Sequence, residues 1–108
     1  MNGTTATPER RTKEKTKVKK QPPYHVILHN DDDHSFEYVI RMLKELFAHP
    51  EETGFKMAEE VHTKGRVIVC TTSLERAELK QEQIHAYGPD PLIARSAGSM
   101  SASIEPAE

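Results

Sequence analysis

The sequence predicts an α+β fold in which a three-stranded antiparallel sheet carries three helices packed on one face. Two short β-rich runs, at 24–29 and 66–72, each precede segments whose apolar residues recur at helical spacing. The chain has 108 residues, a length that favours one small domain. The elements are therefore expected in the order β-α-α-β-α-β, with the last strand at the sheet's edge.

The first strand and the first helix have the clearest patterns. In YHVILH (24–29), Val26 and Leu28 should face one side of the sheet and Ile27 the other. After Ser35, apolar side chains recur every three or four residues up to residue 47, which predicts an amphipathic helix. Ser35 is the expected N-cap of this helix.

The second helix and second strand follow from turn and capping residues. The segment HPEE (49–52) places Pro50 in the first turn of a helix, with acidic residues near its positive end. Gly65 is expected to end that helix as a left-handed cap. RVIVCTT (66–72) is short and rich in β-branched residues, which predicts a strand.

The third helix is predicted from TSLE (72–75), which has the form of a capping box, and should end near Ala86. YGPDP (87–91) contains a glycine and two prolines and breaks it. Residues 92–98 resemble a loop, and SMSASIEP (99–106) alternates weakly, as an edge strand does.

Composition limits the class of protein. Charged residues make up 30% of the chain and hydrophobic residues 35%, so the core is modest. No apolar run approaches the roughly 18 residues that would span a bilayer, and the N-terminus lacks the apolar core of a secretory signal. The single cysteine, Cys70, excludes an internal disulfide and fits a reducing cytosol.

The charge is unevenly distributed. Residues 9–20 carry seven Lys or Arg against two Glu, or +5, so the rest of the chain holds −7 to reach the net charge of −2. We expect residues 1–21 to form a disordered basic tail, because they are too polar to fold, and residues 22–108 to form an acidic domain. Such a tail could contact nucleic acid, an anionic membrane or an acidic partner, and a solvated interaction arm is favoured.

A metal site or an enzyme is poorly supported. The chain contains six histidines and several aspartates, but none of the familiar metal-ligand spacings occurs. No glycine-rich loop follows the first strand, as a nucleotide site would need. We therefore expect no cofactor, no metal and no catalytic activity, with Cys70 packed rather than nucleophilic.

The stretch HNDDDHSFEYV (29–39) suggests a binding site instead. Asn30 and Asp31 follow the first strand, and His62 lies on the last turn of the second helix. Their amide oxygen, carboxylate and neutral imidazole nitrogen are three acceptors, which suit the three donors of an ammonium group. Apolar residues of both helices would lie beside them. On the residues alone a plainer interpretation stays open, with 30–33 as a turn and His62 as a helix-end cation.

Four segments resemble the ClpS adaptor family: YHVILHNDD, EYVIRMLKELF, AEEVHTKG and SLERAELK. The similarity runs from about Pro22 to Glu105. It implies the β-α-α-β-α-β fold already predicted. It also implies a monomeric, non-enzymatic adaptor of the bacterial cytoplasm, which binds no nucleic acid and no membrane. Such an adaptor docks on the N-terminal domain of a ClpA/ClpC-type AAA+ unfoldase and delivers substrates with destabilising, bulky hydrophobic N-terminal residues to the Clp protease.

The resemblance also implies roles for individual residues. Those expected to bind the substrate's α-amino group are Asn30, Asp31 and His62. Those expected to line the side-chain pocket are Phe36, Val39, Ala58, Val61 and Met100. Asp32 and His34 would support the motif, Glu75 and Lys80 would dock on the unfoldase, and the basic tail would engage it.

Two departures from the family pattern bear on specificity. Phe36 and Ala58 stand where the family usually has methionine, so one flexible side chain becomes a rigid ring and another a small gap. Substrate preference is therefore expected to differ from the usual Leu, Phe, Tyr and Trp. The alternative is an unfoldase-docking regulatory module with altered or absent N-terminal recognition. If neutral His62 accepts a hydrogen bond from a charged amine, binding should peak near neutral pH and weaken in acid.

Overall fold

The computed structural model of the chain describes residues 21–108. Its elements are β1 (Tyr24–His29), α1 (Phe36–Phe47), α2 (Glu51–Lys64), β2 (Arg66–Thr72), α3 (Leu74–His85) and β3 (Ala102–Pro106). This is the β-α-α-β-α-β order that the sequence predicts. The prediction of a disordered basic tail at 1–21 falls almost wholly on residues outside the described range.

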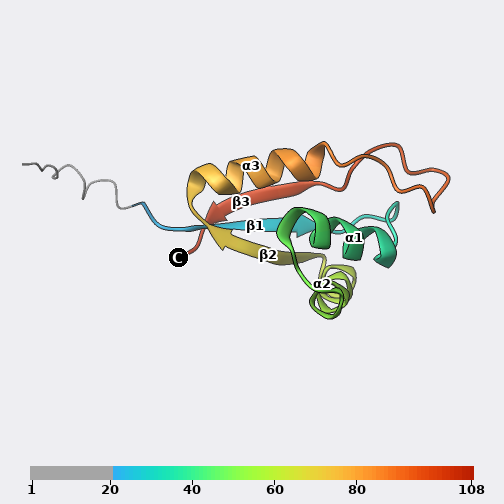
Figure 1. Cartoon of the computed structure of the whole chain (residues 1–108), viewed down its shortest axis with the longest axis horizontal. Helices are drawn as coiled ribbons and strands as arrows, with labels where there is room; N and C mark the ends of the chain where they lie inside the picture. The colour runs from blue at the N-terminus through green and yellow to red at the C-terminus, as the bar shows by residue number, and fades with distance from the viewer. Residues whose placement is uncertain (1–20) are drawn as a thin grey trace, which may run out of the picture.

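The sheet is antiparallel with β1 in the centre, in the order β2-β1-β3 (Figure 1). Val26 pairs with Cys70 on one side and with Ile104 on the other. The pairing with β2 shifts between Val26 and Ile27. Both edge strands are thus held by one buried central strand, whose carboxyl end leads directly into the acidic turn.

A single core lies on one face of this sheet. Val26 and Leu28 are fully buried there, together with side chains from all three helices, namely Tyr38, Val39, Met42, Leu43, Ala58, Val61, Ala77 and Ile84. Ile27 points to the opposite face, as its alternation predicts, and is equally buried, with Ile68 and Ser103 as its cross-strand partners. The one-face arrangement of the helices is therefore confirmed.

The ends of the first two helices agree closely with their local sequence. The Ser35 hydroxyl accepts a hydrogen bond from the Tyr38 N–H at 3.2 Å and so caps α1. Pro50 lies one residue earlier than expected, as the N-cap of α2 rather than inside its first turn. Gly65 ends α2 with φ of 89°, a left-handed conformation that glycine adopts without steric cost.

The start of α3 and the start of β3 differ slightly from prediction. The cap of α3 is Ser73, whose hydroxyl accepts from the Arg76 N–H at 3.3 Å, and not Thr72, which still belongs to β2. β3 begins at Ala102 rather than Ser99, although the His29 N–H donates to the Ser101 carbonyl at 3.0 Å just before it.

The segment between α3 and β3 (residues 86–101) extends past the end of the sheet near the start of α1 (Figure 1). It is held by α1, since the Tyr38 hydroxyl donates to the Gly88 carbonyl at 2.5 Å. The Ser99 hydroxyl in turn accepts from the Gly88 N–H at 2.6 Å. Within residues 21–108, no helix is both long and apolar enough to cross a membrane.

Candidate functional site

A small hollow opens where β1 ends and α1 and α2 meet. The residues that line it are Asn30, His34, Ser35, Phe36, Val39, Ala58, Val61, His62 and Met100. All five predicted pocket residues are among them, and so are two of the three predicted amine-binding residues. The free space inside is about 20 Å³, which is room for about one water molecule.

A backbone hydrogen bond brings the two halves of the predicted amine site together. The Asn30 N–H donates to the Gly65 carbonyl at 3.0 Å, so the end of β1 is joined to the C-cap of α2. His62 lies in the last turn of that helix, with an exposed side chain. Asn30 and His62 are 32 residues apart in the chain but adjacent in space for this reason.

The apolar side of the hollow is closed by Phe36. Its half-buried ring contacts the rings of Phe55 and His62 edge-on, with centroids 5.7 Å away in each case. Behind it Val39, Ala58, Val61 and Met100 are 1–3% exposed. Phe55 shares the spacing of the α2 apolar face but is 49% exposed, so an exposed aromatic ring lies beside the mouth of the hollow.

Asp31 lies beside the hollow without lining it. Its Oδ1 accepts from the Asp33 N–H at 2.9 Å and from His34 Nδ1 at 2.8 Å, and its Oδ2 lies 3.0 Å from the same nitrogen. The side chain is still 36% exposed. The predicted turn is present: Asp32 is exposed, and Asp33 forms an ion pair with Arg95.

Asp90 was not identified from the sequence, which indicated only a break after the third helix. Its carboxylate is 2% exposed and accepts from the Ser35 N–H at 2.6 Å and the Leu92 N–H at 2.8 Å. Burial alone would raise the pKa of Asp90, but these hydrogen bonds and the nearby His34 outweigh it and lower that pKa. The bond to Leu92 is an Asx turn that the sequence could have suggested, whereas the bond to Ser35 is not visible locally.

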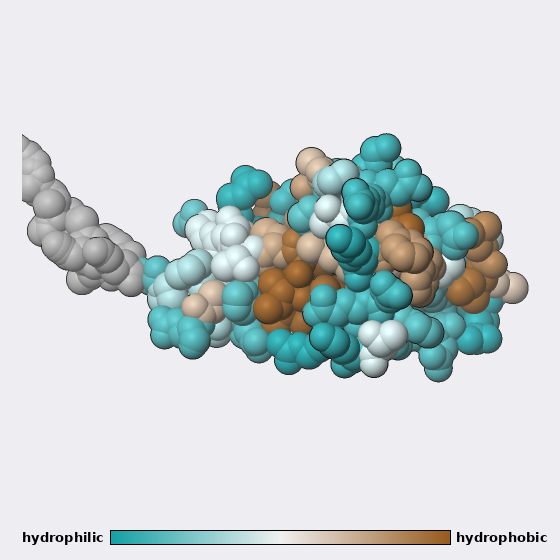
Figure 2. All heavy atoms as spheres, turned by 90° about the horizontal axis from the view of Figure 1, so that it is seen from below, coloured by the Kyte–Doolittle hydropathy of each residue, from teal (hydrophilic) through white to brown (hydrophobic). Residues whose placement is uncertain are grey.

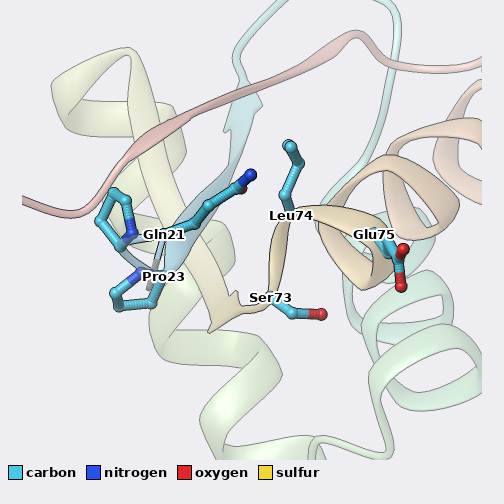
Figure 3. A pocket seen from close by; sticks show the side chains of 6 residues that line it. Gln21, Pro23, Ser73, Leu74 and Glu75 are labelled. Carbon is cyan, nitrogen blue, oxygen red and sulfur yellow. The ribbon is translucent and has the colours of Figure 1, made fainter. Parts of the chain in front are cut away.

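The two predicted docking residues lie in separate hollows. Glu75 lines one of about 480 Å³, where residues 21–23 face the first turn of α3 (Figure 3). Lys80 lines a groove of about 560 Å³ beside β2. The Lys80 ammonium donates to the Leu46 carbonyl at 2.5 Å and lies 5.3 Å from the centre of the Phe47 ring, so it already has partners within the domain.

The remaining candidate chemistry is limited. No group of three or more His, Cys, Asp or Glu within residues 21–108 could hold a metal ion. Cys70 is half-buried, and burial raises the pKa of its thiol although Lys80 and Arg76 oppose this. Among the residues that the structure describes, the exposed large apolar side chains are Phe55, Ile68, Leu79 and Leu92. Figure 2 shows apolar patches separated by polar side chains on one face of the domain.

Comparison with known proteins agrees with the fold and the motifs. Residues 19–93 match the family model described as ATP-dependent Clp protease adaptor protein ClpS. The chain is 38% identical to the ATP-dependent Clp protease adapter protein ClpS of Pectobacterium carotovorum over 80% of this chain and 83% of that one. It is 36% identical to the ClpS of Synechococcus elongatus, over 84% of this chain and 85% of that one.

A solved structure shows the same architecture. Agrobacterium tumefaciens ClpS2 bound to L-phenylalaninamide is 28% identical, with a TM-score of 0.69, over 81% of this chain and 99% of that one. The family model covers more than half of the chain, and the fold and the quoted motifs agree with it. The chain therefore belongs to the ClpS family of ATP-dependent Clp protease adaptor proteins.

Proposed function

We propose that this adaptor binds the free N-terminus of substrate proteins that begin with a bulky hydrophobic residue, and delivers them to a ClpA/ClpC-type AAA+ unfoldase. It acts by binding alone, not as an enzyme. The observation that carries the proposal is one hollow that joins hydrogen-bond acceptors from Asn30 and His62 to buried apolar side chains. The related ClpS2 was solved with L-phenylalaninamide, a ligand that has both an α-amino group and an apolar side chain.

The α-ammonium group would be bound by Asn30, Asp31 and His62. Asp31 remains available for this, because a carboxylate has about four acceptor positions and its side chain is partly exposed. Hydrogen bonds between an ammonium and a carboxylate are of the stronger, charge-assisted class. Acetylation removes the positive charge and donors of the ligand, so recognition should require a free amine.

The first side chain of the substrate would lie among Phe36, Val39, Ala58, Val61 and Met100. A hollow of about 20 Å³ is far too small for a leucine or phenylalanine side chain, so Phe36 must turn outward when a substrate binds. Burial of such a side chain contributes roughly 1.5–3 kcal/mol, from which the displacement of Phe36 subtracts. The resulting moderate binding affinity suits a ligand that must later be released.

The other parts of the proposal concern partners and location. Glu75 and Lys80, on α3, would contact the N-terminal domain of the unfoldase, and the basic segment at 1–21 would assist. We propose that the protein acts as a monomer in the bacterial cytoplasm, a location that its single cysteine fits. It needs no cofactor, metal, nucleic acid or membrane for this role.

The test is fluorescence anisotropy with short labelled peptides that start with Leu, Phe, Tyr, Trp, Ile, Val, Met or Arg, each free and N-acetylated. We expect some free peptides to bind and none of the acetylated ones. Asp31→Ala should abolish binding, whereas Glu37→Ala, an exposed acidic residue at the start of α1, serves as the matched control. Equal binding of free and acetylated peptides would contradict the proposal.

A second candidate is a module that docks on the unfoldase and regulates it without binding N-termini. The observation that favours it is the closed hollow under Phe36. In that case Glu75→Ala and Lys80→Ala should reduce binding to the unfoldase, Asp31→Ala should have no effect there, and no free peptide should bind.

A further inference from the structure

His34 is a buried histidine with an acceptor at each ring nitrogen. Its side chain is 3% exposed. Nδ1 lies 2.8 and 3.0 Å from the two Asp31 oxygens, and Nε2 lies 2.7 Å from the Gly98 carbonyl oxygen. The imidazole therefore joins the turn after β1 to the segment 86–101, across 64 residues of sequence.

These contacts require a hydrogen on both nitrogens. A carboxylate and a carbonyl oxygen can only accept, while a neutral imidazole has one N–H. Only the imidazolium can donate to Asp31 and to Gly98 at the same time. The Ser96 hydroxyl lies farther from Nε2, at 3.3 Å. It could donate to the unprotonated Nε2 of a neutral ring, but the Gly98 carbonyl would then have to move away from that nitrogen.

The surrounding charges favour that cation. Asp31 lies at ion-pair distance, and the buried Asp90 carboxylate is close enough for His34 to lower its pKa. The neighbouring cation on the same segment, Arg95, is already paired with Asp33. On α1, the Tyr38 ring lies 4.5 Å from the His34 ring, centroid to centroid. From α2, His62 lines the same hollow, and its ring contacts Phe36.

We propose that doubly protonated His34 is the positioning residue of the amine site. Its Nδ1–H fixes the Asp31 carboxylate beside the hollow, and its Nε2–H holds Gly98, two residues before Met100 in the pocket wall. The orientation of the amine-binding carboxylate and the position of the pocket wall are thereby set by one ring. This inference rests on the proposed function. It adds that the substrate's amine is bound by a carboxylate whose orientation His34 sets.

The charge of His34 can be measured on the unaltered protein. Nitrogen-15 NMR of the histidine side chains, with His34 assigned by comparison with His34→Gln, distinguishes rings that carry one proton from those that carry two. We expect both nitrogens of His34 to be protonated under the conditions where peptide binds most tightly. A singly protonated ring at full peptide binding would overturn the inference.

Peptide binding then tests the positioning role. His34→Gln can donate to Asp31 or to Gly98 but not hold both, and we expect it to bind about tenfold more weakly, or about 1.4 kcal/mol. If the ring acts through its second proton, the pH profile of peptide binding should also differ between His34→Gln and the unaltered protein. The same peptide is used for both proteins, so titration of its own amine contributes equally to both profiles.

His49→Gln is the matched control. His49 is a half-buried histidine, with a contact of 2.7 Å from Nε2 to the Val69 carbonyl, in the groove beside β2. It should leave peptide affinity and the pH profile unchanged. If the unaltered protein binds peptide and His34→Gln binds it with the same affinity and pH profile, the positioning role alone is refuted. No peptide binding by the unaltered protein would refute the proposed function and this inference together.

Discussion

Replacing Asp90 by Asn should destabilise the domain strongly although the two side chains have nearly the same shape. The Asp90 carboxylate uses one oxygen for the Ser35 N–H and the other for the Leu92 N–H, at 2.6 and 2.8 Å. An asparagine has one oxygen and one NH₂ group. One of the two N–H groups would therefore face another donor inside the protein.

The magnitude follows from these two bonds. A buried donor left without a partner costs about 1–3 kcal/mol. The remaining bond loses its ionised acceptor, which reduces its contribution by about 1 kcal/mol. Together the loss is about 2–4 kcal/mol. Since 1 kcal/mol shifts Tm by roughly 4–8 °C in a domain of this size, Tm should fall by about 8–32 °C.

The assay is thermal and urea unfolding followed by circular dichroism, with Asp32→Asn as control. Asp32 is exposed in the turn next to the same helix, and its replacement should change stability by less than about 0.5 kcal/mol. The hydrogen bonds lower the pKa of Asp90 in the folded state. Its stabilising effect is thus fully present above the unfolded value of about 3.9 and disappears as pH falls through the lower folded value.

The difference in the free energy of unfolding between the unaltered protein and Asp90→Asn should therefore be largest at pH 7 and become smaller in stronger acid. A variant that unfolds within about 2 °C of the unaltered protein at pH 7 would refute the reasoning, given the loss of 4–8 °C per kcal/mol that it assumes. A difference in stability that stays constant as the pH falls ever further below the unfolded value would refute the assignment of the effect to the ionised carboxylate.

The remaining predictions concern single residues. Phe36→Met should raise the affinity for peptides that start with Leu or Phe by about fivefold in anisotropy, because a flexible side chain leaves the hollow more easily; unchanged or weaker binding contradicts this. Gly65→Ala should cost about 1–2 kcal/mol in urea unfolding through left-handed strain at φ of 89°, whereas Gly98→Ala, with equally open space and no positive φ, should be near neutral. Cys70 should react with iodoacetamide more slowly than a free cysteine at pH 8, because burial raises its pKa, and urea should restore the rate. His62→Ala should remove part of the loss of peptide binding in acid; an unchanged acid limb argues against His62 as an acceptor.

The elements of this fold are predictable because their signals are local. The alternation of Val26, Ile27 and Leu28, the hydroxyl of Ser35 and the glycine at 65 each determine backbone geometry within a few residues, and the structure agrees with them. The errors were equally local: Pro50 and Ser73 shift their helix starts by one residue, and β3 is shorter than its weak alternation suggested. The roles expected of Asn30 and His62 likewise came from the resemblance of the surrounding sequence to the ClpS family.

The tertiary structure alone decided how the site is held. Asp90 bonds to Ser35 across 55 residues of sequence, and His34 bonds to Gly98 across 64. Neither partner has a local pattern that indicates the other, because such bonds depend on how the segment 86–101 folds back on the start of α1. The degree to which Phe36 closes the hollow is also a packing result, set by its contacts with Phe55 and His62. The elements, their order and the family follow from local sequence patterns, whereas packing between distant segments sets the orientation of Asp31 and the openness of the hollow.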